Sequence, residues 1–430
     1  MTYEQALEYI HGISWTFCKP GLDRIRILCQ RMGDPQDSLK FIHVAGTNGK
    51  GSFCAMLDSV MREAGYSVGL YTSPYILRFN ERMKVNGEDI TDRELAEITE
   101  YVKPIADSME DKPTEFELIT AIAFEFFKRR GVDLVVLECG MGGRLDSTNV
   151  ITTSILSVIT GIAIDHAAFL GNTVAEIAAE KAGIIKHGVP VLYGGAEPDA
   201  QEIIARAAKD AGAELTITDR SLLSVTEESL EGTVFDLGQL RGVRVSLLGE
   251  YQPKNAANVI NAVEILNRQG YNISEESLRR GLSRATWPAR YEIIHRDPLV
   301  IYDGAHNPQG VDAAVKSTAR YFPDQRVYAL SGVLRDKDYD YIASRIASVA
   351  CKIYTITPDN PRALSAEEYA EAFIRHGATA IPCGGVKEAL FKAIEDAARE
   401  GAHLICLGSL YTYVELYGAL KEYKNLKKEI

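Results

Sequence analysis

The sequence has 430 residues, of which 46% are hydrophobic and 25% charged, a composition typical of globular proteins. A chain of this length predicts two or three domains with sizeable cores. The net charge of -12 and the absence of long Lys/Arg runs exclude nucleic acid and anionic membrane surfaces as expected partners. The seven cysteines are odd in number and form no C-x-x-C pair, which disfavours a disulfide framework and a thiolate zinc site.

The N-terminal stretch MTYEQALEYIHGIS combines helical periodicity with acidic side chains, so it does not predict a signal peptide. No apolar run approaches the roughly 20 residues that a membrane-spanning helix needs. We therefore expect a cytoplasmic protein without a membrane partner.

From Lys40 onward, short apolar strands alternate with helical patterns. The expected strands are FIHVAG, SVGLYTS, VDLVVLECG, SILSVIT and VPVLYGG, and the expected helices cover residues 50–64, 173–187 and 198–211. Continuous apolar strands separated by helices are typical of a parallel sheet that is covered on both faces. The sequence therefore predicts a doubly wound α/β domain.

Residues 222–248 break this rhythm, because apolar and polar residues alternate around glycines as in a half-exposed antiparallel patch. The segment ATWPARYEIIHRDP is rich in proline and charge and predicts a domain boundary. Beyond it, LVIYDG, RVYALSG, KIYTIT and HLICLGS alternate with helical patterns. We expect residues 1–295 to form the first domain and residues 296–430 a second, smaller Rossmann-like α/β domain.

The segment GTNGKGS lies between a predicted strand and a predicted helix, where a phosphate-binding loop is expected. Its glycines let the backbone approach an anion, Lys50 supplies a charge, and Ser52 offers a hydroxyl to phosphate or Mg²⁺. The loop departs from G-x-x-x-x-G-K-[ST], because Val44 replaces the first glycine and Gly51 separates the lysine from the serine. A merely glycine-rich turn would explain neither the lysine nor the hydroxyl.

Polar side chains follow the neighbouring strands. Ser73 before Pro74 fits a helix N-cap and also a Mg²⁺ ligand. Glu138 ends an otherwise apolar strand, where a carboxylate needs either a cation or water. His166 follows the next strand, although a lone histidine is more often structural than a ligand. Because the carboxyl ends of parallel strands meet at one edge, we expect these side chains near Lys50.

Two further segments allow more than one interpretation. In DGAHNP, residues 303–308, an Asx-type helix cap and a site that faces a nucleotide both fit the pattern. Lys181 in EKAG stands near a helix C-terminus before glycine, where a solvated lysine that interacts with the helix dipole is the usual local interpretation.

Together, these motifs resemble those of folylpolyglutamate synthases and dihydrofolate synthases, a branch of the Mur ligase superfamily. The matching segments keep the family's order across nearly the whole chain: GTNGKGS, TSP with RFNER, TEFELITAIAF, ECGMGGRLDSTN, DHAAFLG with EKAGIIK, YQPKNAANV, WPARYE, DGAHNP, DKD and LGS. The glycine before the serine of GTNGKGS is characteristic of this branch. The resemblance implies a Mur-ligase-like α/β fold, in which a P-loop ATPase domain with a parallel-rich sheet precedes a Rossmann-like glutamate-ligase domain.

The resemblance implies an ATP- and Mg²⁺-dependent carbon–nitrogen ligase of folate biosynthesis and one-carbon metabolism. Such an enzyme adds L-glutamate to tetrahydrofolate, and we expect this one also to accept dihydropteroate. A substrate carboxylate takes the γ-phosphoryl group of ATP, the amine of glutamate attacks the acyl phosphate, and phosphate leaves. We expect a monomer.

The resemblance also implies roles for individual residues. The residues implied to bind the ATP phosphates are Thr47, Asn48, Gly49, Lys50, Gly51 and Ser52. The implied Mg²⁺ ligands are Ser73, Glu138 and His166, together with Lys181 if CO₂ converts its amine to a carbamate. The residues implied to contact the nucleotide or to close the cleft over it are Gln252, Asn255, Arg290, Asp303 and His306. Arg82 and Asp146 are implied to contact the substrate. Lys50, Glu138, His166 and Lys181 would be catalytic, and a loop cap stays an alternative for Asp146.

Three residues depart from the family pattern: Tyr75 replaces a frequent histidine after TSP, Ala289 replaces the glycine of P-G-R-F, and Tyr291 replaces its phenylalanine. Two other functions stay open. A peptidoglycan Mur ligase for UDP-sugar peptides usually carries an additional N-terminal domain, whereas only about 40 residues precede the phosphate loop here. A non-catalytic nucleotide switch would leave Glu138, His166 and the second domain unexplained.

Overall fold

The computed structural model describes residues 1–13 and 21–428, which form two compact units. Unit 1 comprises Met1–Ser224, Phe235–Arg244 and Lys254–Ala285, and unit 2 comprises Val225–Val234, Val245–Pro253 and the chain from Thr286 onward. Among these described residues, no helix has the length and apolar character that crossing a bilayer requires.

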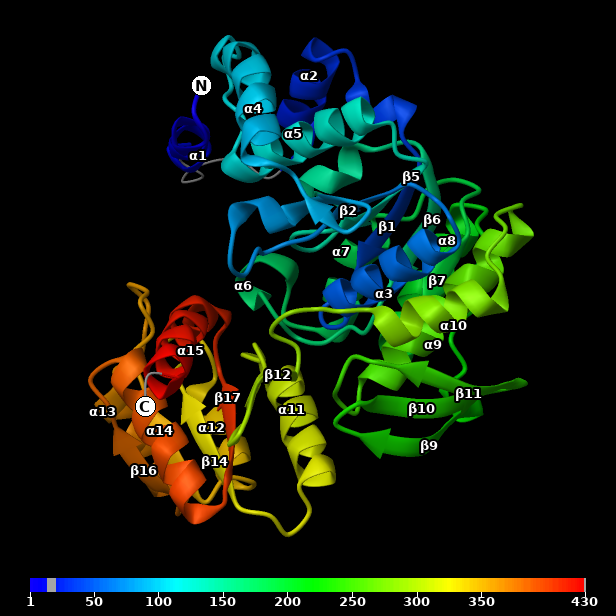
Figure 1. The fold of residues 1–430 in the computed structure, drawn as a ribbon. Helices are drawn as coiled ribbons and strands as arrows, with labels where there is room; N and C mark the ends of the chain where they lie inside the picture. Colours follow the sequence, from blue (N-terminus) through cyan, green and yellow to red (C-terminus); the bar gives the residue numbers. More distant parts are fainter. Residues whose placement is uncertain (14–20, 429–430) are drawn as a thin grey trace. The chain divides into compact units, whose positions relative to one another are not determined.

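Unit 1 is built on an eight-stranded sheet with the strand order β4-β3-β2-β5-β1-β6-β7-β8 (Figure 1). Six strands run parallel: β1 (Phe41–Ala45), β2 (Val68–Tyr71), β5 (Leu134–Glu138), β6 (Ser154–Ile159), β7 (Val191–Tyr193) and β8 (Leu215–Ile217). At one edge, β3 (Met83–Val85) pairs antiparallel with β2, and β4 (Glu88–Asp89) antiparallel with β3. The five strands expected from the apolar segments are confirmed.

Helices cover both faces of this sheet. One face carries α1 (Tyr3–His11), α2 (Asp23–Arg31), α4 (Asp92–Asp107) and α5 (Glu115–Arg130), and beside them α7 (Val174–Ala182) and α8 (Pro198–Asp210). The side chain of Phe41 joins the apolar cluster under α5, whereas Ala45, on the same face of β1, joins the cluster under α7 and α8. The opposite face carries α3 (Lys50–Glu63), which packs on β1, β2 and β5, with α10 (Glu275–Arg284) beside it (Figure 1). The expected doubly wound arrangement is confirmed.

The expected half-exposed patch is a three-stranded sheet with the order β11-β10-β9, formed by β9 (Leu223–Ser229), β10 (Gly232–Leu237) and β11 (Leu240–Val245). The long helix α9 (Gln252–Arg268) follows it.

Unit 2 has a six-stranded sheet with the order β12-β13-β17-β14-β15-β16. Five strands are parallel: β13 (Leu299–Tyr302), β14 (Val327–Ser331), β15 (Lys352–Thr355), β16 (Thr379–Pro382) and β17 (His403–Leu407). One face packs under α11 (Pro308–Tyr321), α12 (Tyr339–Ala347) and α13 (Ala366–Arg375). From the other face, Tyr328 and Tyr354 reach carboxylates of α14 (Val386–Glu400), on which α15 (Tyr413–Lys428) packs.

The structure corrects three local predictions. The boundary segment contains a strand, β12 (Glu292–Arg296), which pairs antiparallel with β13. Both β12 and β16 are partly exposed edge strands, so their apolar patterns are too weak to separate them from loops. The helix cap considered for Ser73 is wrong, because no helix begins at Pro74.

The described residues contain six free cysteines, of which Cys29, Cys54, Cys139 and Cys406 are buried. They act there as small apolar side chains, as the sequence suggests. Cys18 lies outside the described residues.

Gly281 of α10 packs directly on the helix that follows the phosphate loop. A Cβ at this position would lie 2.4 Å from Cα of Val60, and Oγ of Ser59 donates a hydrogen bond to the Gly281 carbonyl at 2.8 Å. We predict that Gly281→Ala pushes α10 away from α3 and destabilises the protein by about 1–3 kcal/mol, measured by urea unfolding.

The matched control is Gly418→Ala in α15, where no atom lies within 4 Å of the added Cβ. There the exchange should stabilise the helix by roughly 0.5–1 kcal/mol. Equal effects of the two substitutions would contradict the close packing of α10 on α3.

Candidate active site

The phosphate loop connects β1 to α3, as expected. Gly49 is the N-cap of α3 and has a φ of 88°, a left-handed conformation that favours glycine. A Cβ at Gly46 would lie 1.8 Å from Oγ1 of Thr160, and one at Gly49 would lie 2.7 Å from Oδ1 of Asn255. The loop is held from the β6 side, because the Thr47 amide donates to the Gly161 carbonyl at 2.8 Å. Its shape therefore depends on glycine and on neighbours from β6 and α9.

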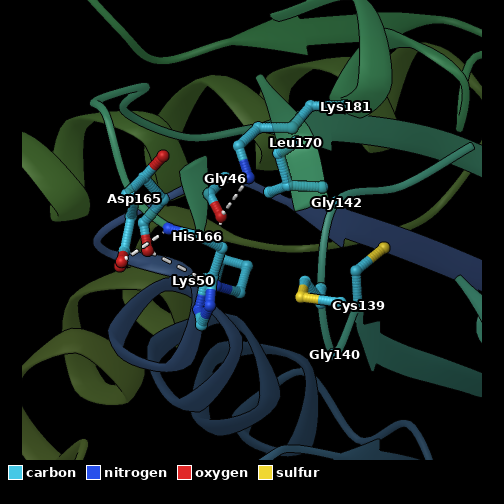
Figure 2. Close-up of a pocket in the computed structure, with 11 residues that line it drawn as sticks. Gly46, Lys50, Cys139, Gly140, Gly142, Asp165, His166, Leu170 and Lys181 are labelled. Atoms are coloured by element: carbon cyan, nitrogen blue, oxygen red, sulfur yellow. Dashed lines mark hydrogen bonds between the residues drawn. The ribbon is translucent and has the colours of Figure 1, made fainter. Parts of the chain in front are cut away.

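Two lysine side chains meet on one backbone carbonyl of this loop. Nζ of Lys50 donates to the Gly46 carbonyl at 3.0 Å, and Nζ of Lys181 donates to the same oxygen at 3.0 Å. Figure 2 shows Lys181 reaching down to Gly46 from α7, opposite the N-terminal turn of α3 that carries Lys50. Lys181 is only 3% exposed, so the solvated lysine considered from the local sequence is wrong.

This arrangement makes the charged form of Lys181 costly. Burial and, to a smaller extent, the charge of Lys50 lower the pKa of Lys181 to about 7, although Cys139, Asp165 and Asp146 act in the opposite direction. A lysine with a pKa near 7 is about half neutral at physiological pH. Its amine is thus available as a nucleophile.

Glu138 and Ser73 lie beside Lys50. Glu138, at the end of β5, is only 4% exposed, and its Oε1 lies 4.0 Å from Nζ of Lys50. The amide of Ser73 donates to Oε2 of Glu138 at 3.2 Å. The structure therefore brings the ends of β1, β2 and β5 together. A buried carboxylate beside a hydroxyl residue is a donor set that suits Mg²⁺.

His166 lies in the segment between β6 and α6 (Ala167–Leu170). Its side chain is exposed, its φ is 52°, and its backbone amide donates to Oδ1 of Asp165 at 2.9 Å. A pocket at the loop is lined by both residues together with Lys50, Lys181, Cys139, Leu170 and residues 46–47 and 140–142 (Figure 2). The described residues hold no group of three His, Cys, Asp or Glu side chains that could bind a metal. The metal ligands expected from the sequence include only two such residues, Glu138 and His166.

The loop after β5 attaches to the helix that carries Lys181. Nη2 of Arg144 lies 2.7 Å from Oε1 of Glu180, and the Arg144 amide donates to the Glu180 carbonyl at 2.8 Å. Asp146 caps a short 3-10 helix, η3 (Ser147–Val150), by accepting from the Thr148 amide at 3.0 Å. Its other oxygen accepts from the Met141 amide at 2.8 Å. Burial raises the pKa of Asp146, and these hydrogen bonds oppose the shift.

Arg82 and Tyr75 lie on the segment after β2. The guanidinium of Arg82, at the end of η2 (Phe79–Arg82), lies 5.1 Å from the ring centre of Tyr75 and 5.7 Å from that of Phe79. Tyr75 is 37% exposed. Phe79 is buried, so the partly exposed ring of Tyr75 beside this cation is the surface suited to a flat, polar ligand.

In unit 2, Asp303 is a buried acceptor at the end of β13. It accepts from the Tyr251 hydroxyl at 2.9 Å, the Tyr291 amide at 2.9 Å and the Ala305 amide at 2.8 Å. Burial raises the pKa of Asp303, and the charge of Arg290 opposes the shift. Asp303 therefore holds the backbone around Arg290 in place.

Arg290 stands between two residues with left-handed backbone. Ala289 has a φ of 55° and Tyr291 a φ of 48°, which explains why the family pattern has glycine at the first of these positions. Nδ1 of His306 lies 2.8 Å from the Gly304 carbonyl. Asn307 caps α11, so the cap interpretation of DGAHNP holds for this residue.

Gln252 and Asn255 occupy the first turn of α9, and both are buried. Asn255 lies against Gly49 of the phosphate loop. Gln252 belongs to unit 2 and Asn255 to unit 1.

Sequence reasoning missed two features of the site. The carbonyl of Gly46 is a shared acceptor, and no side-chain pattern can show a backbone oxygen. His43 of β1 and Thr148 of the following loop form a buried polar pair at 2.8 Å. A histidine in the apolar run FIHVAG is the only sequence signal of that pair.

The chain matches two family patterns in sequence. The pattern of the Mur ligase middle domain matches residues 44–263, and that of the Mur ligase glutamate ligase domain matches residues 289–410. A dihydrofolate synthase/folylpolyglutamate synthase of Bacillus subtilis is 40% identical over 86% of this chain and 88% of that protein. A folylpolyglutamate synthase of Lacticaseibacillus casei is 37% identical over 86% of this chain and 89% of that protein.

Solved structures match over almost the full length. The structure of Escherichia coli FolC in complex with DHPP and ADP has a TM-score of 0.86 at 29% identity and covers 99% of both chains. That of Mycobacterium tuberculosis folylpolyglutamate synthase complexed with ADP has a TM-score of 0.87 at 30% identity and covers 97% of this chain and 98% of the other. With both Mur ligase domains in order and relatives that match over most of their length, the chain belongs to the folylpolyglutamate synthase/dihydrofolate synthase family of the Mur ligase superfamily.

Proposed function

We propose that this protein is an ATP-dependent amide ligase that adds L-glutamate to tetrahydrofolate and its polyglutamates, and also to dihydropteroate. The observation that carries the proposal is the meeting of Lys50, Glu138 and Lys181 at the phosphate loop of a chain with this family's two domains. The E. coli relative whose structure contains DHPP and ADP supports a pterin substrate and ATP.

The residues of this chain suit the chemistry of acyl phosphate formation. A substrate carboxylate attacks the γ-phosphorus of ATP and ADP leaves; the glutamate amine then attacks the acyl carbon and phosphate leaves. Lys50 would leave its carbonyl partners in the loop to neutralise the phosphates, and the amides at the start of α3 would bind the phosphate oxygens. Both anionic reactants could then approach each other.

Mg²⁺ fits the donors at the strand ends. Ser73 and Glu138 would hold one ion, and His166 with a carbamylated Lys181 a second, where the ions would screen the charge of the phosphates. Arg82 and Asp146 would face the pterin substrate. The residues that would contact the nucleotide or close over it are Arg290, Asp303, His306, Gln252 and Asn255.

The remaining expectations from the sequence are also part of the proposal. Residues 1–295 would bind ATP, and residues 296–430 would supply the glutamate-ligase domain. The monomeric state and the cytoplasmic location stay predictions.

A ligation assay tests the proposed function. With ATP, Mg²⁺ and L-glutamate, we expect both dihydropteroate and tetrahydrofolate to gain glutamate, with one phosphate released per amide bond, followed by mass spectrometry and phosphate detection. Activity with tetrahydrofolate alone would leave a synthase that only extends folate tails. Nucleotide hydrolysis without any amide product from either acceptor would contradict the ligase.

Glu138→Gln tests the magnesium proposal. The amide keeps the shape of the side chain but is a far poorer ligand for a hard cation. We predict that the Mg²⁺ concentration for half-maximal ligation rises at least tenfold. The matched control is Glu125→Gln in α5, a buried carboxylate that pairs with Arg129 at 2.7 Å, and its Mg²⁺ activation curve should equal that of the wild type. Overlapping curves for all three proteins would remove Glu138 from the metal site.

The pKa of Lys181 gives a pH dependence to carbamylation. Only the neutral amine attacks CO₂, and the neutral fraction rises as the pH increases through about 7. At fixed dissolved CO₂, we therefore predict that the carbamate signal of Lys181, measured by ¹³C NMR with ¹³CO₂, increases from pH 6 to pH 8.

Lys181→Ala should lose at least 100-fold in activity and recover part of it with small carboxylates such as formate, which can replace the carbamate. Lys181→Glu supplies its own carboxylate and should gain nothing from formate. Full activity of Lys181→Ala without any added carboxylate would contradict the carbamate.

A further inference from the structure

His43 is a fully buried imidazole in the centre of the unit 1 sheet. It lies in β1 opposite Leu137 and Ser157, and its side chain is 0% exposed. On its face of β1, Phe41 belongs to the cluster under α5 and Ala45 to the cluster under α7 and α8. His43 thus stands at the junction of the two clusters. An imidazole at such a position costs free energy unless it is hydrogen-bonded.

The hydrogen bonds around His43 run in one direction. Oγ1 of Thr148 lies 2.5 Å from Oδ1 of Asp146 and 2.8 Å from Nε2 of His43. The carboxylate only accepts, so the single hydroxyl proton of Thr148 goes to Asp146, and the hydroxyl oxygen accepts from Nε2–H of His43. Nδ1 of His43, which carries no proton in this tautomer, is buried without a hydrogen-bond partner. Burial, helped by the charge of Lys186, lowers the pKa of His43 to about 3, so the ring is neutral.

This donor chain ends on the loop that forms a wall of the pocket. Asp146 also accepts from the Thr148 amide at 3.0 Å and from the Met141 amide at 2.8 Å, and Met141 lines the pocket at the phosphate loop. Sγ of Cys139, another residue of the pocket wall, lies 3.1 Å from Nε2 of His43. These contacts of His43 therefore connect β1, which carries the phosphate loop, to both ends of the segment 139–148.

We propose that His43 and Thr148 are positioning residues that orient the Asp146 carboxylate, and with it the 139–148 loop, toward the pterin substrate. The inference rests on the proposed function, in which Asp146 faces that substrate. A buried polar network could be replaced by apolar side chains at little cost if packing were its sole role, so its directional bonding indicates a role in placing Asp146.

The test compares Thr148→Val with Thr148→Ser. Valine keeps the volume but removes the hydroxyl, whereas serine keeps the donor and acceptor. We expect Thr148→Val to raise the KM for the pterin substrate about tenfold, with KM values for ATP and glutamate within twofold of the wild type, and Thr148→Ser to stay close to the wild type. Equal rises in all three KM values, or equal defects in both variants, would overturn the proposal in favour of a structural role.

Substitutions of His43 test the other end of this series of hydrogen bonds. Glutamine places an amide donor near the position of Nε2, and asparagine near that of Nδ1, so His43→Gln should keep the low KM for the pterin substrate better than His43→Asn. The reverse order would contradict the assigned tautomer.

Hydrogen exchange separates this inference from the proposed function. Measured by mass spectrometry without substrate, the peptide covering residues 140–149 should exchange at least tenfold faster in Thr148→Val than in the wild type or Thr148→Ser, while the peptide covering residues 44–52 stays unchanged. Unchanged exchange in residues 140–149 would overturn the inference even if the enzyme is a folate ligase. The wild-type protein could also ligate neither acceptor while Thr148→Val still exchanges faster in residues 140–149. That outcome would mean that the loop is held as inferred but the proposed function is wrong, and it would overturn the substrate part of the inference.

Discussion

Two lysine side chains donate to one carbonyl oxygen, that of Gly46, and the chemistry of the site depends on this contact. Two adjacent ammonium groups, one of them buried, repel each other, and the carboxylate of Glu138 lies 4.0 Å from Lys50. The more deeply buried amine, Lys181, therefore loses its proton more easily. The loop then presents Lys50 to phosphate, and it presents an amine, that of Lys181, of which about half is neutral near pH 7 and open to modification.

The scaffold keeps this contact in place through long-range packing. Lys50 is fixed by α3, whose outer side packs on α10 at Gly281. Lys181 is fixed by α7, to which the loop after β5 is tied by Arg144 and Glu180. The sheet orders β5, β1 and β6 side by side, so that their carboxyl ends supply the residues of one site. In unit 2, Asp303 has a similar supporting role for the backbone around Arg290.

Much of this could be predicted from the sequence, because the deciding signals were local. The apolar runs gave the central strands, GTNGKGS marked the loop, and the carboxylate at the end of an apolar strand marked Glu138. The side chains of the edge strands β12 and β16 are mostly intermediate or exposed, so their sequences lack the apolar pattern that would have predicted a strand. The burial of Lys181 and the pairing of His43 with Thr148 also escaped, because each depends on partners more than 100 residues away in the chain.

The central claim is that burial and the neighbouring charge of Lys50 make the Lys181 amine lose its proton near neutral pH. The most direct measurement is the pH titration of the Lys181 side chain by NMR in metal-free, CO₂-free protein with labelled lysine, assigned by comparison with Lys181→Arg. The account predicts a midpoint near 7. A midpoint above about 10, the range of a lysine in water, would contradict it.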